Sequence, residues 1–262
     1  MRMKRLSTSI LLLAGMILST SCLVQADDED LAGLFSVRGV TGTIIITSLD
    51  GGISYVYNET RSREQFLPAS TFKMLNTLIA LQEGAIRDEQ EILKWDGTDK
   101  GRPEWNRDQS MASAFPASCV WFYQELARRV GDRKYQQYLR RLKYGNRKTG
   151  PDVTTFWLEG DLRISAVEQI AFMKKLVKEE LPFSKGHMQV LKKLMTVEET
   201  SRYSLKAKTG WTGRNGIGWY VGYVETKGNT RLFAMNLDTV KPGDEKYRQE
   251  ITREALKLKG IL

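Results

Sequence analysis

Segments with the alternating, β-branched pattern of strands lie near both ends of this 262-residue chain. Residues 41–47 and 53–57 are separated by Asp50-Gly51-Gly52, a hairpin turn signal. Three more strand-like segments, 203–207, 216–225 and 230–238, come near the end, and mostly helical patterns lie between the two groups. The arrangement predicts an α/β fold of the α+β type, in which one antiparallel sheet collects N- and C-terminal segments and a helical lobe is inserted between them.

Helical periodicity and capping signals predict seven helices and one long irregular connection. The helices are expected over residues 28–35, 70–83, 119–130, 134–142 and 165–179, in a segment after Ser184, and over 244–259. Ser165-Ala166-Val167-Glu168 has the capping-box pattern. Residues 146–163 are largely irregular, and a connection of that length in a compact domain is usually functional.

The first 26 residues have the pattern of a secretory signal peptide. Arg2, Lys4 and Arg5 precede an apolar run over residues 10–18, and small residues lead to a cleavage site after Ala26. We therefore expect a signal peptide over residues 1–26, a single catalytic domain over 27–262 and export to the periplasm. A lipid anchor at Cys22 is the alternative. Removal of the three basic residues lowers the net charge from +9 to +6.

The mature chain is poor in metal-binding and imidazole groups. It keeps one cysteine, Cys119, and one histidine, His187, so it has neither an internal disulfide nor a Cys/His zinc cluster, and we predict no metal site. A Ser-His-Asp triad would have to use His187, which lies in a polar stretch. The basic residues are spread along the chain, which argues against nucleic-acid binding.

Ser70 and Lys73 are the candidate nucleophile and base. Pro68-Ala69-Ser70 opens a predicted helix, and residues at i and i+3 share one helix face, so the amine of Lys73 can lie beside the hydroxyl of Ser70. The positive end of the helix dipole favours negative charge near the serine oxygen. This pairing is typical of an activated serine nucleophile with a lysine-derived base.

Two further motifs accompany this pair, although an S-x-x-K pattern alone is weak evidence. Ser118-Cys119-Val120 opens a predicted helix, and Cys119 is interpreted as a small buried residue. The triplet K-T-G occurs twice, at 148–150 and at 208–210. The second copy ends a strand pattern, which holds a lysine more firmly than a loop does, so we assign the substrate-binding role to Lys208.

The ordered set of motifs resembles the class D, oxacillinase-type serine β-lactamases. It consists of Ser70-Thr71-Phe72-Lys73, Ser118-Cys119-Val120, Tyr144-Gly145-Asn146, Phe156-Trp157-Leu158-Glu159, Lys208-Thr209-Gly210 and Tyr247-Arg248-Gln249. It covers nearly all of the mature chain. The resemblance implies the fold shared by β-lactamases and penicillin-binding transpeptidases, and hydrolysis of the β-lactam amide bond, which gives antibiotic resistance.

The resemblance also implies roles for individual residues. Ser70 would form the acyl-enzyme, and Lys73, carboxylated by carbon dioxide or bicarbonate and held by the indole N–H of Trp157, would be the general base of both steps. Ser118 would relay a proton to the lactam nitrogen. The backbone N–H groups of Ser70 and Trp211 would hold the oxyanion. The expected substrate-binding residues are Lys208, Thr209, Gly210, Trp211, Arg248, Val120, Leu158 and Tyr144.

Other readings remain open from the sequence alone. A penicillin-binding protein or a sensor would be acylated without turnover, and a non-enzymatic envelope protein would have an idle site. The expected partners are small β-lactam substrates, with no membrane span in a mature protein that is a monomer or a homodimer. Arg214, in the turn 212–216, is a candidate for tuning substrate range or a solvated turn residue. Trp105 and Met111 could line the mouth of the site, but the sequence alone leaves them unplaced.

Overall fold

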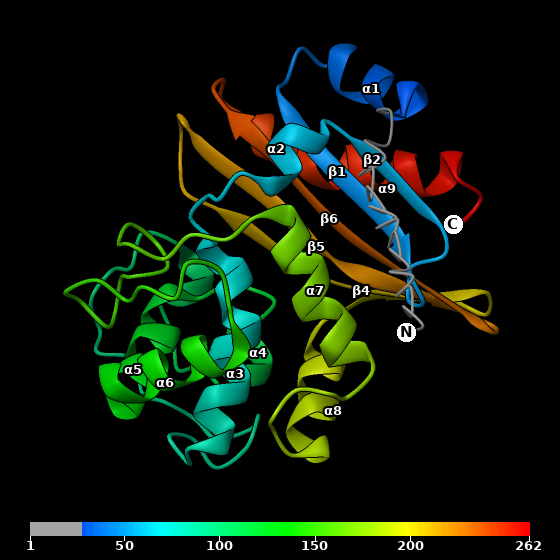
Figure 1. Ribbon diagram of the computed structural model, residues 1–262. Coiled ribbons are helices and arrows are strands. Elements are labelled where there is room, and N and C mark those ends of the chain that lie inside the picture. Colours follow the sequence, from blue (N-terminus) through cyan, green and yellow to red (C-terminus); the bar gives the residue numbers. More distant parts are fainter. Residues whose placement is uncertain (1–27) are drawn as a thin grey trace, which may run out of the picture.

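The computed structural model describes residues 28–262, and its central element is a six-stranded antiparallel sheet (Figure 1). The strands are β1 (Gly42–Ser48), β2 (Ser54–Tyr57), β3 (Thr196–Glu199), β4 (Tyr203–Trp211), β5 (Gly216–Thr226) and β6 (Asn229–Thr239). Their order is β2-β1-β6-β5-β4-β3, so the first strand pairs with the last. The predicted sheet of N- and C-terminal segments is confirmed.

Helices cover both faces of the sheet and form a lobe beside it. The α-helices of residues 28–262 are α1 (Glu29–Ser36), α2 (Glu59–Arg63), α3 (Lys73–Gln82), α4 (Met111–Ala114), α5 (Val120–Val130), α6 (Asp132–Leu142), α7 (Ala166–Val177), α8 (Lys185–Leu194) and α9 (Tyr247–Leu258). Three short 3-10 turns are η1 (Ala69–Phe72), η2 (Pro103–Trp105) and η3 (Asp244–Lys246).

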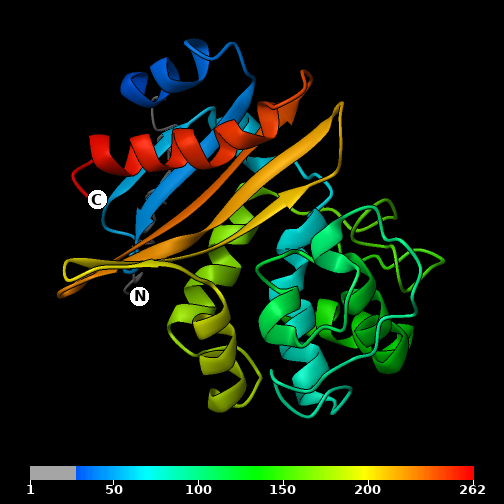
Figure 2. The same ribbon diagram turned by 180° about the vertical axis from the view of Figure 1, so that it is seen from behind.

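The sheet separates two hydrophobic cores. Alternate residues of β1 point to opposite faces, as the pleat requires: Ile44 and Ile46 pack under α1 and α9, whereas Ile45 joins the larger core on the other face. Helix α7 crosses that other face (Figure 1), and α9 packs with α1 on the first face, where it lies in front of the sheet in Figure 2. The larger core continues from the sheet into α3, α5 and α8, so lobe and sheet form one packed body.

Most predicted elements are confirmed, and three short ones were missed. Helix α7 starts at the predicted capping box, in which the Ser165 hydroxyl accepts from the N–H of Glu168. Strand β3, helix α2 and helix α4 have four or five residues each and carry no periodic pattern long enough to detect. Cys119 caps α5 and precedes its first turn. The predicted signal peptide and Cys22 lie outside the described residues.

Candidate active site

Ser70 and Lys73 are in direct contact at the junction of lobe and sheet. Ser70 lies in the turn η1, and Lys73 is the first residue of α3, which continues that turn. The Nζ of Lys73 donates a hydrogen bond of 2.9 Å to the Oγ of Ser70. Ser70 is 9% exposed and Lys73 is fully buried. The nucleophile therefore opens to solvent while its partner amine lies beneath it.

The turn that carries Ser70 is held in an unusual backbone conformation. Ala69 has φ of 48°, in the left-handed region that residues with a Cβ rarely adopt. Its N–H donates to the carbonyl of Trp157 at 2.9 Å. Ser118 also has a positive φ, 52°. Strained residues of this kind persist where the surrounding structure fixes them, and they concentrate at functional sites.

The environment of Lys73 favours a neutral amine. Burial lowers its pKa to about 7, while the nearby Cys119 acts in the opposite direction. The Nζ lies 5.4 Å from the ring centroid of Tyr123. Among the described residues, no carboxylate forms an ion pair with Lys73. About half of these amines are therefore unprotonated near pH 7.

Trp157 brings an unsatisfied donor into the same buried region. Its ring is fully buried and stacks on Phe72, with centroids 5.5 Å apart. Its Nε1 has no hydrogen-bond acceptor among the described residues. A buried N–H without an acceptor costs about 1–3 kcal/mol, so such groups are rare and mark places where a further acceptor fits.

Ser118 and Lys208 form the second polar pair of the site. Ser118 lies two residues before the start of α5, and Lys208 lies on β4, as the sequence predicts. The Nζ of Lys208 donates to the Oγ of Ser118 and, at 3.1 Å, to the carbonyl of Thr209. Burial, together with the charges of Lys73 and Arg248, holds the pKa of Lys208 well below its usual range. A substrate carboxylate would relieve this repulsion.

Gly210 allows β4 to lie directly against the Ser70 turn. A Cβ at this position would come within 2.9 Å of the carbonyl of Pro68 and 3.2 Å of Thr71 and of Trp219. Only a residue without a side chain permits that approach. The neighbouring residue Trp211 is 36% exposed, and its Nε1 donates to Thr239 at 3.2 Å. The glycine of the K-T-G motif thus sets the distance between strand and nucleophile.

A cleft of about 210 Å³ opens above these groups. It brings together eight of the predicted residues, which are Ser70, Ser118, Val120, Leu158, Thr209, Gly210, Trp211 and Arg248. The guanidinium of Arg248 donates to the carbonyl of Glu245, and its buried Nε has no partner among the described residues. Burial lowers the pKa of Arg248. The cleft therefore combines two serine hydroxyls, an apolar wall and an incompletely paired guanidinium.

Tyr144, which is predicted among the substrate-binding residues, is not one of the residues that line this cleft. It is 3% exposed, and its ring packs edge-on against Phe72 and Phe172. In the motif Tyr144-Gly145-Asn146, the side chain of Asn146 stabilises the irregular connection. Its Nδ2 donates to the carbonyl of Asp161 at 2.7 Å, and its Oδ1 accepts from the N–H of Arg163 at 3.0 Å. Met111, which the sequence left unplaced, lies in the core.

Arg102 and Pro116 line the cleft and were missed, and Trp105 is now placed there. Arg102 precedes η2, and its guanidinium lies over the Trp105 ring, 5.0 Å from the centroid. Trp105 Nε1 donates to the carbonyl of Ala117 at 2.9 Å. Arg102 and Pro116 come from loops without periodicity, so no sequence signal could have found them.

The alternatives considered from sequence lie elsewhere. Lys148 of the first K-T-G triplet is exposed on the connection after α6. His187 is in the first turn of α8, where its ring contacts Gln82 at 3.3 Å, and it does not line the cleft. Within residues 28–262, no group of three or more His, Cys, Asp or Glu side chains is arranged to hold a metal ion.

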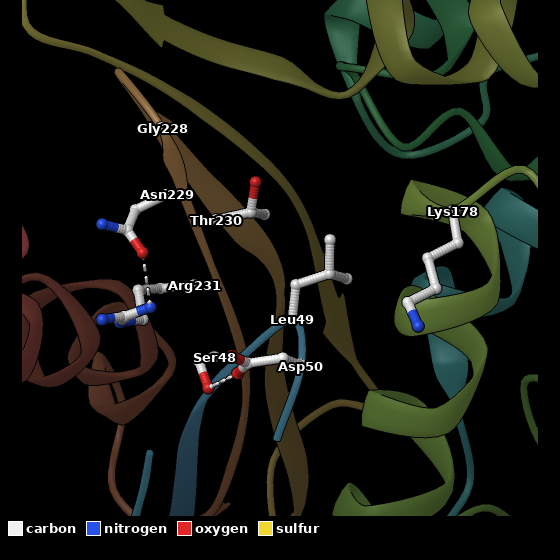
Figure 3. A pocket seen from close by; sticks show the side chains of 8 residues that line it. All are labelled: Ser48, Leu49, Asp50, Lys178, Gly228, Asn229, Thr230 and Arg231. Carbon is white, nitrogen blue, oxygen red and sulfur yellow. Dashed lines mark hydrogen bonds between the residues drawn. The ribbon is translucent and has the colours of Figure 1, made fainter. Parts of the chain in front are cut away.

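A separate pocket of about 320 Å³ lies between the end of β1, the β5–β6 turn and Lys178 (Figure 3). Its polar groups are largely paired with one another. The Asp50 carboxylate accepts from the Ser48 hydroxyl and from the N–H of Gly52, and Arg231 donates to Asn229 at 3.2 Å. The pocket contains none of the predicted site residues, so we place the chemistry in the Ser70 cleft.

No helix in residues 28–262 is both long and apolar enough to cross a membrane.

Comparisons with known proteins agree with this geometry. A family model described as the penicillin binding protein transpeptidase domain matches residues 39–257. Beta-lactamase OXA-2 of Salmonella typhimurium is 41% identical over 231 residues, which are 87% of this chain and 83% of that protein. Beta-lactamase OXA-48 of Klebsiella pneumoniae is 38% identical over 230 residues, 87% of each chain.

Solved structures give the same result. The class D β-lactamase YbXI from Nostoc superposes with a TM-score of 0.86 at 40% identity, covering 88% of this chain and 99% of that one. The class D β-lactamase FUS-1 of Fusobacterium nucleatum subsp. polymorphum gives a TM-score of 0.87 at 34% identity, covering 90% and 100%. Together with the paired Ser70 and Lys73 and the cationic cleft above them, these likenesses show that the chain belongs to the class D β-lactamase family.

Proposed function

We propose that this protein hydrolyses the amide bond of β-lactam antibiotics through an acyl-enzyme on Ser70 and thereby confers resistance to them. The observation that carries this proposal is the contact of 2.9 Å between Ser70 Oγ and Lys73 Nζ at the floor of a cationic cleft. The β-lactamase names of the relatives support it.

Lys73 activates the nucleophile. With a pKa near 7, its amine is unprotonated in a substantial fraction of the molecules at neutral pH, and in that form it can be carboxylated to give the base that accepts the proton of the neighbouring Ser70. The serine oxygen then attacks the lactam carbonyl, and the carbonyl π electrons move to its oxygen. The backbone N–H groups of Ser70 and Trp211, both at the cleft, are the proposed donors to that oxyanion.

Carboxylation of Lys73 is part of the proposal. A neutral amine adds to carbon dioxide with loss of one proton, which gives an N-carboxylate. Two features support a carboxylate group on Lys73. The amine is buried with a lowered pKa, and the indole N–H of Trp157 lacks an acceptor. When present, the carboxylate supplies a general base for acylation and for the water of deacylation.

The cations position the substrate and its leaving group. Ser118, hydrogen-bonded to Lys208, is placed to pass a proton to the lactam nitrogen as the C–N bond breaks. Thr209 and Arg248, which line the cleft, and Lys208, which is buried against Ser118, bind the substrate carboxylate, for which a planar guanidinium is well suited. Val120 and Leu158 supply the apolar wall. Metal ions have no part in this proposal.

The test is hydrolysis of a chromogenic cephalosporin with and without added bicarbonate, together with intact-mass spectrometry. We expect steady turnover, a transient adduct, and loss of both in Ser70→Ala. A persistent adduct on Ser70 without turnover would instead indicate a penicillin-binding protein or a sensor. No adduct and no turnover in bicarbonate-replete buffer would contradict acyl transfer altogether.

We propose export to the periplasm, with cleavage after Ala26, on the basis of residues 1–26. The mass of the protein recovered from the periplasm distinguishes this from retention through a lipid on Cys22. The proposed oligomeric state, monomer or homodimer, is measured on the same sample by light scattering.

A further inference from the structure

The mechanism uses one guanidinium, but the cleft contains two. Arg248, at the start of α9, lies on the sheet side, and Arg102, just before η2, lies on the lobe side. The two groups are close enough for the charge of Arg102 to contribute to the lowered pKa of Arg248. No step of the proposed reaction employs Arg102.

The wall that carries Arg102 is held by several contacts. The guanidinium lies 5.0 Å from the centroid of the Trp105 ring, a cation–π geometry. Trp105 is held by its ring and by its backbone: its Nε1 donates to the carbonyl of Ala117 at 2.9 Å, and its carbonyl accepts from the indole N–H of Trp121 at 2.8 Å. The backbone N–H of Trp105 also donates to the carbonyl of Arg102 at 2.9 Å. The cation is thus presented on a supported aromatic surface.

The charge of Arg102 is only loosely compensated. Its carboxylate partner among the described residues is Glu104, at 3.7 Å, and both side chains are 47% exposed. Exposed pairs of this kind contribute about 0–1 kcal/mol. A ligand anion entering the cleft can therefore replace Glu104 at little cost, and it would also reduce the repulsion between Arg102 and Arg248.

We propose that Arg102 is a second anion-binding position of the cleft, selective for β-lactams that carry an acidic group on the acyl side chain in addition to the ring carboxylate. The inference rests on the proposed function. The ring carboxylate is bound by Arg248, Lys208 and Thr209, and the second anion meets Arg102 on the opposite wall. Two anions on one substrate would then each face a separate guanidinium.

The test compares benzylpenicillin with carbenicillin, which differ by one carboxylate on the side chain. Values of kcat/KM are measured for both substrates in the wild type, Arg102→Gln, Arg102→Lys and Arg107→Gln. Arg107 is the matched control, because it is an exposed arginine of the same segment that does not line the cleft.

In Arg102→Gln we expect the ratio of kcat/KM for carbenicillin to that for benzylpenicillin to fall about fivefold, mainly through KM. Arg102→Lys should restore part of the ratio, and 0.5 M salt should reduce the wild-type ratio. Arg107→Gln should leave the ratio unchanged.

An unchanged ratio in Arg102→Gln, or an equal fall for both substrates, overturns the second anion position while leaving the hydrolytic function intact. A ratio that falls equally in Arg107→Gln also overturns it, because the effect would then come from net charge. A wild-type protein that hydrolyses neither penicillin overturns the proposed function itself.

Discussion

Burial lowers the pKa of Lys73 enough for its amine to lose its proton without a neighbouring base. An ordinary lysine with a pKa near 10.4 is protonated at neutral pH and cannot accept a proton from serine. Removal from water lowers the pKa of Lys73 to about 7, and the one histidine of the chain is not in the cleft. The packing around Lys73 thus gives a neutral amine at a pH where an exposed lysine would still be protonated.

The first prediction concerns the pH dependence of activity. Below pH 7 the unprotonated fraction of Lys73 decreases about tenfold for each pH unit, so kcat/KM for a chromogenic cephalosporin should show an acid limb near pH 7. Added bicarbonate should restore part of the activity, since carboxylation removes neutral amine from the protonation equilibrium. Stopped-flow rates between pH 5.5 and 8.5 measure this, and a flat profile would show that Lys73 is not the titrating base.

The second prediction concerns the unpartnered N–H of Trp157. Trp157→Phe keeps an aromatic ring on Phe72 but removes the donor. We expect turnover to fall about tenfold to a hundredfold, the contribution of one hydrogen bond to a charged group, with deacylation affected more than acylation. Saturating bicarbonate should recover part of the loss.

Single-turnover kinetics and the lifetime of the adduct measure the two steps of Trp157→Phe separately. The matched control is Trp95→Phe, because Trp95 donates its N–H to Thr98 in an exposed loop that does not line the cleft. An equal loss in both variants would mean that the effect is one of general stability.

At the scale of elements, the site depends on one close approach. Strand β4 and the turn η1 meet where Gly210 lies against Pro68, and this contact sets the position of Lys208 and Trp211 relative to Ser70. The approach joins an element of the sheet to an element of the lobe. The distance between nucleophile and substrate-binding strand is therefore fixed by backbone packing.

The third prediction follows from that contact. Gly210→Ala places a methyl group 2.9 Å from the carbonyl of Pro68, which must displace β4 from the turn. Misplacing catalytic groups by about 1 Å costs on the order of a hundredfold in rate, so kcat/KM should fall about tenfold to a hundredfold. Gly33→Ala in α1, where the added methyl meets nothing, should leave kcat/KM unchanged. Normal activity in Gly210→Ala would contradict the close approach as a determinant of catalysis.

The sequence predicts features that follow from local spacing and periodicity, and it misses features that depend on long-range contacts. Ser70 and Lys73 are close because i,i+3 spacing is a local rule, and β4 was found because its pattern alternates. Arg102 reaches the cleft only because the Trp105–Trp121 contact folds its loop there, and a loop has no period to reveal this. The packing of Tyr144 against Phe72 and Phe172 could not be predicted, because its position in a motif does not show which way its ring points.

For the whole molecule, the neutral lysine is a cost to stability. The unfolded chain holds Lys73 near pKa 10.5 and the folded protein near 7, so the unfolded state binds more protons between these values. Stability therefore rises with pH in that interval. The penalty is fully present below pH 7 and disappears as the pH approaches 10.5.

The fourth prediction uses this linkage. Lys73→Met removes the buried charge and keeps the shape, so it should raise Tm by several degrees at pH 6, with a gain that shrinks as the pH rises to 10. Melting curves in buffer free of carbon dioxide measure the effect. Lys148→Met, at an exposed lysine, is the control and should show no such trend. A gain independent of pH would show that the buried amine is not the cause.

The pairing of β1 with β6 has a consequence for how the chain folds. Ile45 lies opposite Ala234, so strand β1 finds its inner neighbour only after nearly 190 further residues have been made. Contacts this distant in sequence form slowly, because the entropy of closing the loop must be overcome first. The hairpin of β1 and β2 therefore has one unpaired edge until β6 is made. The helices between β2 and β3 can form before that. The last strand to be synthesised is the one that completes the sheet, and a chain cut short before it leaves that edge open to aggregation.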